Sequence, residues 1–399
     1  MPASLQTVNN ILKEIYDGTI RDQLNDEVIA LKSVERSSEG IDHTAGGKYV
    51  SFPIRVRRNQ GIGSRNENEL LPAAGQQGFE SVRIPLKYQY GAVKMTGQSM
   101  ELANENYQAF ASALELEMDG LKNDLVKDQN RQIYGTAKGT LATATAIGTG
   151  VNTVQVAANT GSKYLEVGQQ VDVVTTDGVT VRAADRQITA INTTTGVVTL
   201  SGAVFTTAVG DVIVRQGNYG REINGLASLV TSTGALQNVD PSTVPQWAAL
   251  VNANGGTNRA LSESAMIKMT DDIRKNSGRT SLILCGLGVR RAYWQLLVQQ
   301  RQFTNTKEFS GGLTGLAFNN GREIPVIEDP DAPDNLMYFL DESSLKFYRP
   351  KDWSWLNRDN SIWKWVQGYD AYQAIYHIYQ ELATTARNAN GVLADLIEG

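Results

Sequence analysis

The chain has 399 residues, with 37 Lys+Arg against 42 Asp+Glu, a formal net charge of −5 and 41% apolar residues. These values are ordinary for a globular protein and exclude wholesale disorder, a collagen-like repeat and a disulfide scaffold. No apolar run approaches the roughly 18 residues that a membrane-spanning helix needs. The slight acidic excess argues against a dedicated nucleic-acid binder.

Few residues are available for catalysis or for transition-metal binding. Cys285 lies in an apolar run and is expected to be a small buried hydrophobe. His43 and His377 have neither a cysteine nor a second histidine at metal-ligand spacing. No Walker loop, nucleophile elbow or zincin motif occurs. We therefore expect no enzyme activity, no catalytic residues and no cofactor.

One acidic cluster is the best candidate for a divalent-cation site, because hard cations need several carboxylate oxygens. The cluster comprises Glu328, Asp329, Asp331 and Asp334. It lacks the EF-hand spacing and contains Pro330 and Pro333, which favours a solvated turn instead. We therefore assign no metal ligand.

Residues 4–33 carry apolar side chains three to five apart, which predicts one amphipathic helix or two short ones. Residues 48–58 and 79–94 then alternate apolar and polar side chains, which predicts the two strands of a long hairpin. Each strand would reach about 33 Å at about 3.3 Å per residue. The glycine-rich segment between them, with Leu70 and Leu71 its largest apolar residues, predicts an arm that lies on a neighbouring molecule.

Residues 103–134 show apolar residues at intervals of three and four, which predicts a spine helix of about 45 Å at 1.5 Å per residue. Residues 140–217 are rich in Thr, Val, Ala and Gly and show short alternating runs between turn signals. They predict a small all-β domain inserted into a larger α+β protein.

A mixed pattern returns after residue 220, with predicted helices at 262–276 and 289–300 and predicted strands at 281–287 and 322–330. Four tryptophans then predict a second hairpin joined by residues 357–361, with Trp353 and Trp355 in one strand and Trp363 and Trp365 in the other. Paired aromatic residues stabilise a sheet or an interface more often than they bind sugar. A carbohydrate-binding face stays open as a less favoured alternative.

The order of these parts resembles the major capsid proteins of tailed bacteriophages with the HK97-type fold. Two local matches support the resemblance: GREIPVIEDPDAP at 321–333 is similar to a strand and proline turn of the family, and MYFLDESSLKFYRP at 337–350 to the next strand. The resemblance implies an α+β HK97-like capsid fold with an all-β insertion. Its parts would be an N-terminal arm (1–42), an extended loop hairpin (48–86), a peripheral domain (87–139 and 335–380) with the spine helix, the inserted domain (140–217) and an axial domain (218–334 and 381–399).

The function implied is a major capsid protein that assembles into hexamers and pentamers of an icosahedral head around double-stranded DNA. The resemblance also implies a virion protein assembled in the host cytoplasm, with a portal protein and, since the arm is short, a separate scaffolding protein. A decoration protein stays open, DNA contact is expected to be weak and non-specific, and no membrane is involved. The alternatives are an encapsulin-type protein compartment or, less favoured, a carbohydrate-binding or metal-dependent protein.

Two segments are expected to form subunit interfaces. The extended loop carries both arginines and glutamates, and the glutamates dilute the positive field, which favours a rim of interchain salt bridges over a nucleic-acid surface. These residues are Arg55, Arg57, Arg58, Arg65, Glu67 and Glu69. In the peripheral loop, the expected interface residues are Asn357, Arg358, Asp359 and Asn360.

Overall fold

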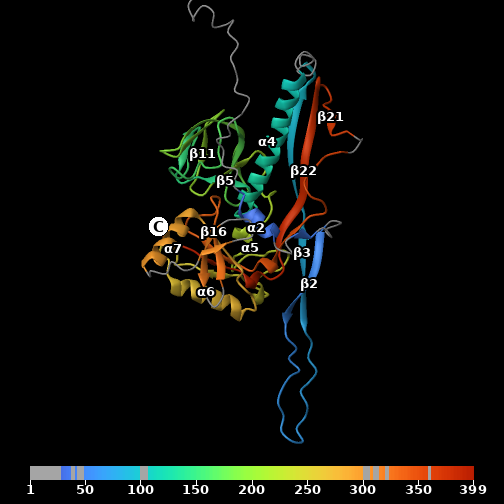
Figure 1. The fold of residues 1–399 in the computed structure, drawn as a ribbon, viewed down its shortest axis with the longest axis vertical. Helices are drawn as coiled ribbons and strands as arrows, with labels where there is room; N and C mark the ends of the chain where they lie inside the picture. Colours follow the sequence, from blue (N-terminus) through green and yellow to red (C-terminus); the bar gives the residue numbers. More distant parts are fainter. Residues whose placement is uncertain are drawn as a thin grey trace, which may run out of the picture.

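A computed structural model describes residues 28–36, 41–42, 49–98, 107–299, 306–308, 314–319, 323–357 and 361–399. Its described strands form three larger sheets, one small two-stranded sheet and one projecting hairpin (Figure 1). Helices cover two of these sheets, whereas the third is a separate all-β body beside the long helix α4. This architecture confirms the α+β fold class.

The first sheet is built around the long strand β22 (Ala371–Thr384). β4 (Lys87–Thr96) runs antiparallel to it over ten residue pairs, and β19 (Leu345–Tyr348) pairs with its C-terminal end. The spine helix α4 (Tyr107–Ile133) lies against β4. A side chain at Gly91 in β4 would come within 2.6 Å of the Leu125 Cδ1 atom, so the glycine allows the helix to approach the strand closely.

The predicted strand at 79–94 is in fact two strands with different partners. β3 (Gly78–Pro85) pairs with β2 (Tyr49–Arg57) in the projecting hairpin, whereas β4 belongs to the first sheet. The change of partner comes directly after Pro85, which has no N–H to donate to a continuing ladder. The alternation of apolar and polar residues predicted extended chain through 79–94, but it could not show that the two halves pair with different strands.

The predicted tryptophan hairpin is wrong. β20 (Ser354–Trp355) and β21 (Trp363–Trp365) do not pair with each other within the described residues. Both pair with β22, at His377–Tyr376 and at Ala374–Tyr372, so they lie end to end along one edge of that strand. The long β22 supplies more pairing edge than either short strand could offer the other.

The second sheet has the strand order β13-β23-β18-β14-β17-β16-β15. α6 (Glu263–Lys275) begins after Ser262, whose hydroxyl oxygen accepts the Ala265 N–H at 3.3 Å. α7 (Leu287–Gln299) follows the buried strand β14. These elements lie where the sequence predicted them. The strand bounds are Leu250–Asn252, Gly391–Leu393, Met337–Leu340, Leu282–Cys285, Glu323–Glu328, Thr314–Asn319 and Thr306–Glu308.

The sheets divide the chain differently from the boundaries expected at 335 and 381. β18, expected in the peripheral domain, lies between β14 and β23 in the second sheet, and its four residues are all buried. A fully apolar strand is stable at the centre of a covered sheet. Residues 381–384 are a direct continuation of β22 in the first sheet.

Residues 140–215 form the third body, which we call the module. Its main sheet has the order β5-β12-β8-β9-β10-β7, and β6 and β11 form a small second sheet. The first strand pairs with the last, since Thr140 lies opposite Val214. The buried cluster of the module draws on residues from Leu141 to Ile213. The strand bounds are Thr140–Thr143, Val212–Arg215, Gln170–Val174, Val181–Asn192, Val197–Leu200, Thr153–Gln155, Gly148–Val151 and Phe205–Thr207.

The N-terminal arm expected at 1–42 is partly built into the subunit itself. α2 (Ala30–Arg36) packs with Val28, Leu31 and Val34 buried in the main hydrophobic cluster. The carboxylate of Asp329 accepts the Ala30 N–H at 2.9 Å and so satisfies the start of this helix. β1 (Ile41–Asp42) adds a parallel strand to β19. Residues 1–27 and 103–106, where the arm and the start of the spine helix were expected, lie outside the described residues.

Candidate assembly surfaces

The extended loop, residues 49–85, is anchored at its base and projects away from the body (Figure 1). The inward side chains of its base, Val82 and Ile84, are fully buried in a cluster that includes Trp247. The Arg83 N–H donates to the Gln237 carbonyl oxygen at 2.9 Å. The base therefore holds the hairpin in one direction relative to the sheets.

The outer part of the loop, residues 58–77, is ordered without strands. The Asn59 amide nitrogen donates to the Gly75 carbonyl oxygen at 3.0 Å, and the Asn59 amide oxygen accepts the Gly61 N–H at 2.6 Å. At the tip, the Glu69 carboxylate accepts the Asn66 N–H at 2.9 Å, which lowers the pKa of Glu69. Asn68 holds the turn with a φ of 64°. The chain thus presents a defined tip.

All six extended-loop residues expected at an interface are exposed. Arg65 donates to the Leu70 carbonyl oxygen at 2.8 Å, and Arg55 reaches Gln77 at 3.4 Å. No arginine of this set forms an ion pair with any other described residue. Their charges are therefore available to another molecule.

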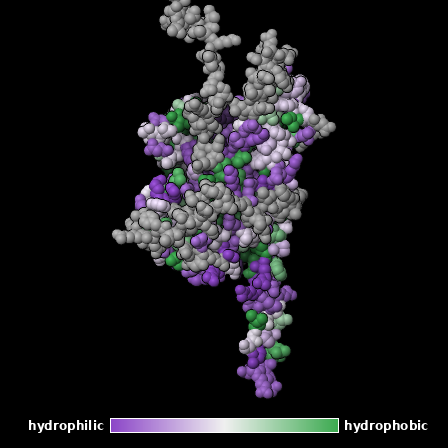
Figure 2. All heavy atoms as spheres, viewed as in Figure 1, coloured by the Kyte–Doolittle hydropathy of each residue, from purple (hydrophilic) through white to green (hydrophobic). Residues whose placement is uncertain are grey.

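The same arm exposes large apolar side chains (Figure 2). Ile62 is 81% exposed, Leu70 91% and Leu71 78%. Apolar side chains that a subunit leaves in water on a projecting segment are typical of a surface that is covered on association.

The structure describes only one of the four residues expected at an interface in the peripheral loop. Asn357 is exposed after β20, whereas Arg358, Asp359 and Asn360 lie outside the described residues. The tryptophans beside this loop do not form one open face, because Trp353 and Trp355 both pack on Tyr376, with ring centroids 5.3 and 4.8 Å away. The Trp353 indole N–H also donates to Gln129 in α4 at 3.2 Å. This arrangement does not support the carbohydrate-binding alternative.

The acidic cluster after β17 is not a solvated turn. Asp329 is fully buried and Asp331 is 6% exposed. The Asn130 amide donates to both carboxylates, and Lys127 and Lys163 lie 3.1 and 3.3 Å from the Asp331 carboxylate. Among the described residues no group of acidic or imidazole side chains has the arrangement of a metal site. The cluster connects α2, α4 and the module. Its hydrogen-bond donors and cations come from segments distant in the sequence, so the residues around 328–334 alone could not indicate them.

A second polar group, which we call the junction, connects the module to the spine helix; its members are buried except for Arg215. It comprises Asp128, Arg131, Arg215 and Glu222. Arg131 lies 3.0 Å from Asp128 and 2.5 Å from Glu222, and Arg215 at the end of the module lies 3.1 Å from Asp128. Burial would raise the pKa of Asp128, but the two arginines hold it below its usual value. Burial raises the pKa of Glu222. The sequence analysis missed this group.

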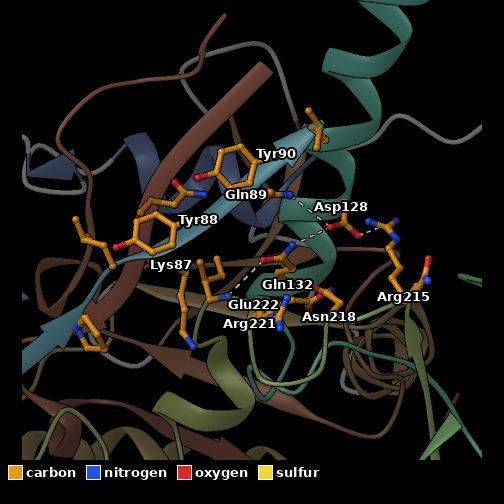
Figure 3. Close-up of a pocket in the computed structure, with 17 residues that line it drawn as sticks. Lys87, Tyr88, Gln89, Tyr90, Asp128, Gln132, Arg215, Asn218, Arg221 and Glu222 are labelled. Atoms are coloured by element: carbon orange, nitrogen blue, oxygen red, sulfur yellow. Dashed lines mark hydrogen bonds and ion pairs between the residues drawn. The ribbon is translucent and has the colours of Figure 1, made fainter. Parts of the chain in front are cut away.

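A cleft of about 730 Å³ opens between β4, α4 and residues 215–223, beside the junction (Figure 3). Gln380 lines it with only 1% of its surface exposed, and neither atom of its amide has a hydrogen-bond partner among the described residues. The buried Gln89 amide oxygen also lacks a partner there. Two cations, Lys87 and Arg221, line the cleft, and neither forms an ion pair within the described residues. The Lys87 ammonium donates to the Gly220 carbonyl oxygen at 2.8 Å.

Other titratable groups are structural. Burial raises the pKa of the Cys285 thiol to about 12, which leaves it uncharged and unreactive. Burial also raises the pKa of Glu381 to about 8, against the hydrogen bond from the Asn224 N–H and the charge of Lys87. His377 stacks near Tyr90 in the first sheet, and His43 lies outside the described residues. No helix in the described part of the chain is long and apolar enough to span a membrane.

Comparison with known proteins identifies this architecture. Residues 204–354 match the model of a family described as SU10 major capsid protein. A chain from the capsid asymmetric unit of cyanophage A-1(L) shares the fold over 99% of both chains, with a TM-score of 0.62 and 13% identity. The chain has the HK97-type capsid fold, and its residues 204–354 are similar to the SU10 major capsid protein family.

Two other solved structures resemble this fold. A capsid chain of the native GTA particle covers 99% of both chains at a TM-score of 0.52 and 10% identity. The SrpI encapsulin of Synechococcus elongatus has 8% identity and covers 100% of this chain and 96% of the other, but its TM-score of 0.48 is too low to bear on function. No curated protein matches the sequence.

Proposed function

We propose that this chain is a major capsid protein of a tailed phage. It would form hexamers and pentamers of an icosahedral head that encloses double-stranded DNA, and the extended loop would join neighbouring subunits. The observation that carries the proposal is the exposed arm, with Leu70 and Leu71 almost fully in water and its arginines free of ion pairs within the described chain. Such a projection adds interface area without requiring two compact bodies to match rigidly. This property suits a shell whose subunits occupy slightly different environments.

The protein acts as a structural component and not as an enzyme. The buried Cys285 and the ion-paired acidic clusters support this part of the proposal, because both serve internal packing. A net charge of −5 suits a wall that contains DNA without binding it tightly. We further infer a portal protein and a separate scaffolding protein as partners, a decoration protein as an optional one, and assembly in the host cytoplasm.

Electron microscopy of the full chain, expressed with the scaffolding protein of its phage, tests the proposal. Empty icosahedral shells are the expected result of this expression, and DNA-filled icosahedra with a portal are expected from infected cells. Uniform small shells that hold a cargo enzyme and lack a portal would instead favour a protein compartment. A protein that stays monomeric or dimeric under these conditions would contradict both shell functions.

A further inference from the structure

We propose that Arg387 positions the extended loop, because its guanidinium holds residues 228–239, which we call the bracket, in the shape to which the base of the loop is fixed. The inference rests on the proposed shell function, since the direction of the loop decides which neighbouring subunit it can reach. Only 1% of Arg387 is exposed. It therefore acts from inside the subunit and not as an interface residue.

The guanidinium of Arg387 binds one short stretch of the bracket. A guanidinium is a rigid planar fork of donors, so it fixes the oxygens that it binds relative to one another. Arg387 lies in η4 (Arg387–Ala389), shortly after the end of β22, and so ties the bracket to the first sheet. Its five acceptors are the carbonyl oxygens of Ser228, Leu229, Thr233 and Gly234, at 3.2, 3.1, 3.1 and 2.9 Å, and the hydroxyl oxygen of Thr231.

The cation is buried among uncharged acceptors, since each of these oxygens belongs to a peptide group or a hydroxyl. Burial lowers the pKa of Arg387 to about 10, against the charge of Asp240, so the side chain stays protonated at neutral pH. Burying a charge is costly unless hydrogen bonds compensate for it. The cation is therefore stable only while the bracket keeps this shape.

The bracket depends on outside contacts for its shape. From residue 230 to its end the bracket, all of which the structure describes, contains no helix or strand. Two backbone hydrogen bonds of 3.0 Å join Leu236 and Val239, and Gln237 and Asn238 between them have φ angles of 53° and 69°. Such left-handed conformations of non-glycine residues persist only where surrounding contacts impose them. The hydrogen bonds of Arg387 hold the chain that leads into this turn.

The far end of the bracket contacts the base of the extended loop. The Gln237 carbonyl oxygen accepts the Arg83 N–H of β3 at 2.9 Å. The Leu236 carbonyl oxygen accepts the Trp247 indole N–H at 3.3 Å, and Trp247 shares a buried cluster with Val82 of β3. β2 and β3 form a sheet of their own, in which no further described strand pairs with either edge. The direction of the hairpin therefore depends on contacts such as those with the bracket.

Spin labels can measure the direction of the loop in the unassembled subunit, with one label on the tip at Glu67→Cys and one on the module at Glu166→Cys. Both positions are exposed, and the one natural cysteine, Cys285, is fully buried. Double electron–electron resonance should give one narrow distance distribution for the chain with Arg387. Arg387→Ala should broaden the distribution by about twofold or more, because the acceptors in the bracket lose their donor.

Arg259→Ala is the matched control for this measurement. Arg259 also donates from its guanidinium to carbonyl oxygens, those of Asn252 and Ala394, which lie outside the bracket. Its loss should leave the distance distribution unchanged. A narrow distribution in Arg387→Ala, or an equal broadening in Arg259→Ala, would overturn the inference.

Arg387→Lys provides a test that does not depend on the folding of the alanine variant. It keeps the charge but replaces the planar fork with a single ammonium group. Hydrogen exchange of the Arg83 amide should become about tenfold faster, whereas the amides of β14 should exchange at their original rate. An unchanged rate at Arg83, or an equal acceleration at β14, would show that Arg387 does not act through the bracket.

The yield of shells relates this role to assembly. In chains expressed with the scaffolding protein, Arg387→Ala should lower the yield by about tenfold, because a loop without a fixed direction loses more conformational entropy on docking. Arg259→Ala should leave the yield unchanged. A normal yield from a chain with a broad distance distribution would overturn the link between loop direction and assembly.

The two proposals fail in different ways. The distance and exchange measurements use the unassembled subunit, so they decide the role of Arg387 whether or not shells form. Failure of the unchanged chain to form any shell would contradict the proposed function alone.

Discussion

The extended loop and the junction use the same types of charged residue in opposite ways. In the loop, Arg57 and Glu67 are exposed and form no ion pair among the described residues. In the junction, Arg131 is 6% exposed and bonds two carboxylates at once. The difference indicates that the charged side chains of the loop are available to bind other molecules. Those of the junction instead fix the module on the spine helix.

The largest expected effect comes from breaking the junction. Arg131→Met leaves Glu222 buried without its cation and removes one of the two cations beside Asp128. We expect the free energy of unfolding of the unassembled subunit to fall by about 3–5 kcal/mol. Urea denaturation of the variant measures this loss.

Arg290→Met is the matched control, because Arg290 pairs with Glu328 at 3.5 Å and both side chains are more than a third exposed. That change should cost about 0–1 kcal/mol. Equal losses for the two variants would show that the junction is no stronger than a surface pair.

A second buried carboxylate, that of Glu381, makes the stability of the subunit depend on pH. Burial raises the pKa of Glu381 to about 8 from an ordinary 4.5, against the hydrogen bond from the Asn224 N–H and the charge of Lys87. The stability that the protonated form contributes is complete below pH 4.5 and is lost as the pH rises through about 8.

Glu381→Gln keeps the oxygen that accepts the Asn224 N–H and removes the ionisation. It should raise the free energy of unfolding at pH 9 by about 2–4 kcal/mol and leave it nearly unchanged at pH 5. Thermal unfolding at both pH values measures the difference. A variant with the same pH dependence as the unchanged chain would contradict this assignment.

The module should fold by itself once the junction is cut, because its buried cluster uses only its own residues and its first and last strands pair. Residues 140–217 expressed alone are expected to give a β-type circular dichroism spectrum and a cooperative melt. A random-coil spectrum would mean that the module depends on the spine helix for its fold, and not only for its position.

The smallest effect per residue is expected at the extended loop. Exposed ion pairs contribute about 0–1 kcal/mol each and are screened by salt, so only their repetition over a shell makes them important. Arg57→Glu together with Arg58→Glu should reduce particle yield, more strongly at low salt, without lowering the stability of the soluble subunit. Sedimentation of assembly reactions at two salt concentrations measures the yield, and unchanged assembly would show that these arginines face solvent or DNA.

The sequence predicted elements whose signal is local. The alternation at 48–58 and the apolar spacing of the spine helix are properties of single segments, and β2 and α4 lie where these patterns placed them. Arg55 and Arg57 are exposed, as their place on the polar face of the alternating run predicted. Their role as an interface stays a prediction.

The errors concern contacts between distant segments. Asp329 was expected in water, but α2 and α4 supply its donors from residues 30 and 130. The junction joins residues 128, 131, 215 and 222, which no spacing rule connects. The tryptophan strands were paired with each other because the sequence could not show that β22 has an edge long enough for both.

The pairing of Thr140 with Val214 has a consequence for how such a chain can vary. Because the polypeptide leaves and re-enters the spine region at adjacent points, a short turn between residues 139 and 217 could replace the whole insertion without moving either end. The replacement would remove Lys163 and Arg215, the cations that the module supplies to Asp331 and Asp128. A chain that lost the insertion would keep Arg131 beside Asp128 and Lys127 beside Asp331, so each carboxylate would retain one cation from the spine helix.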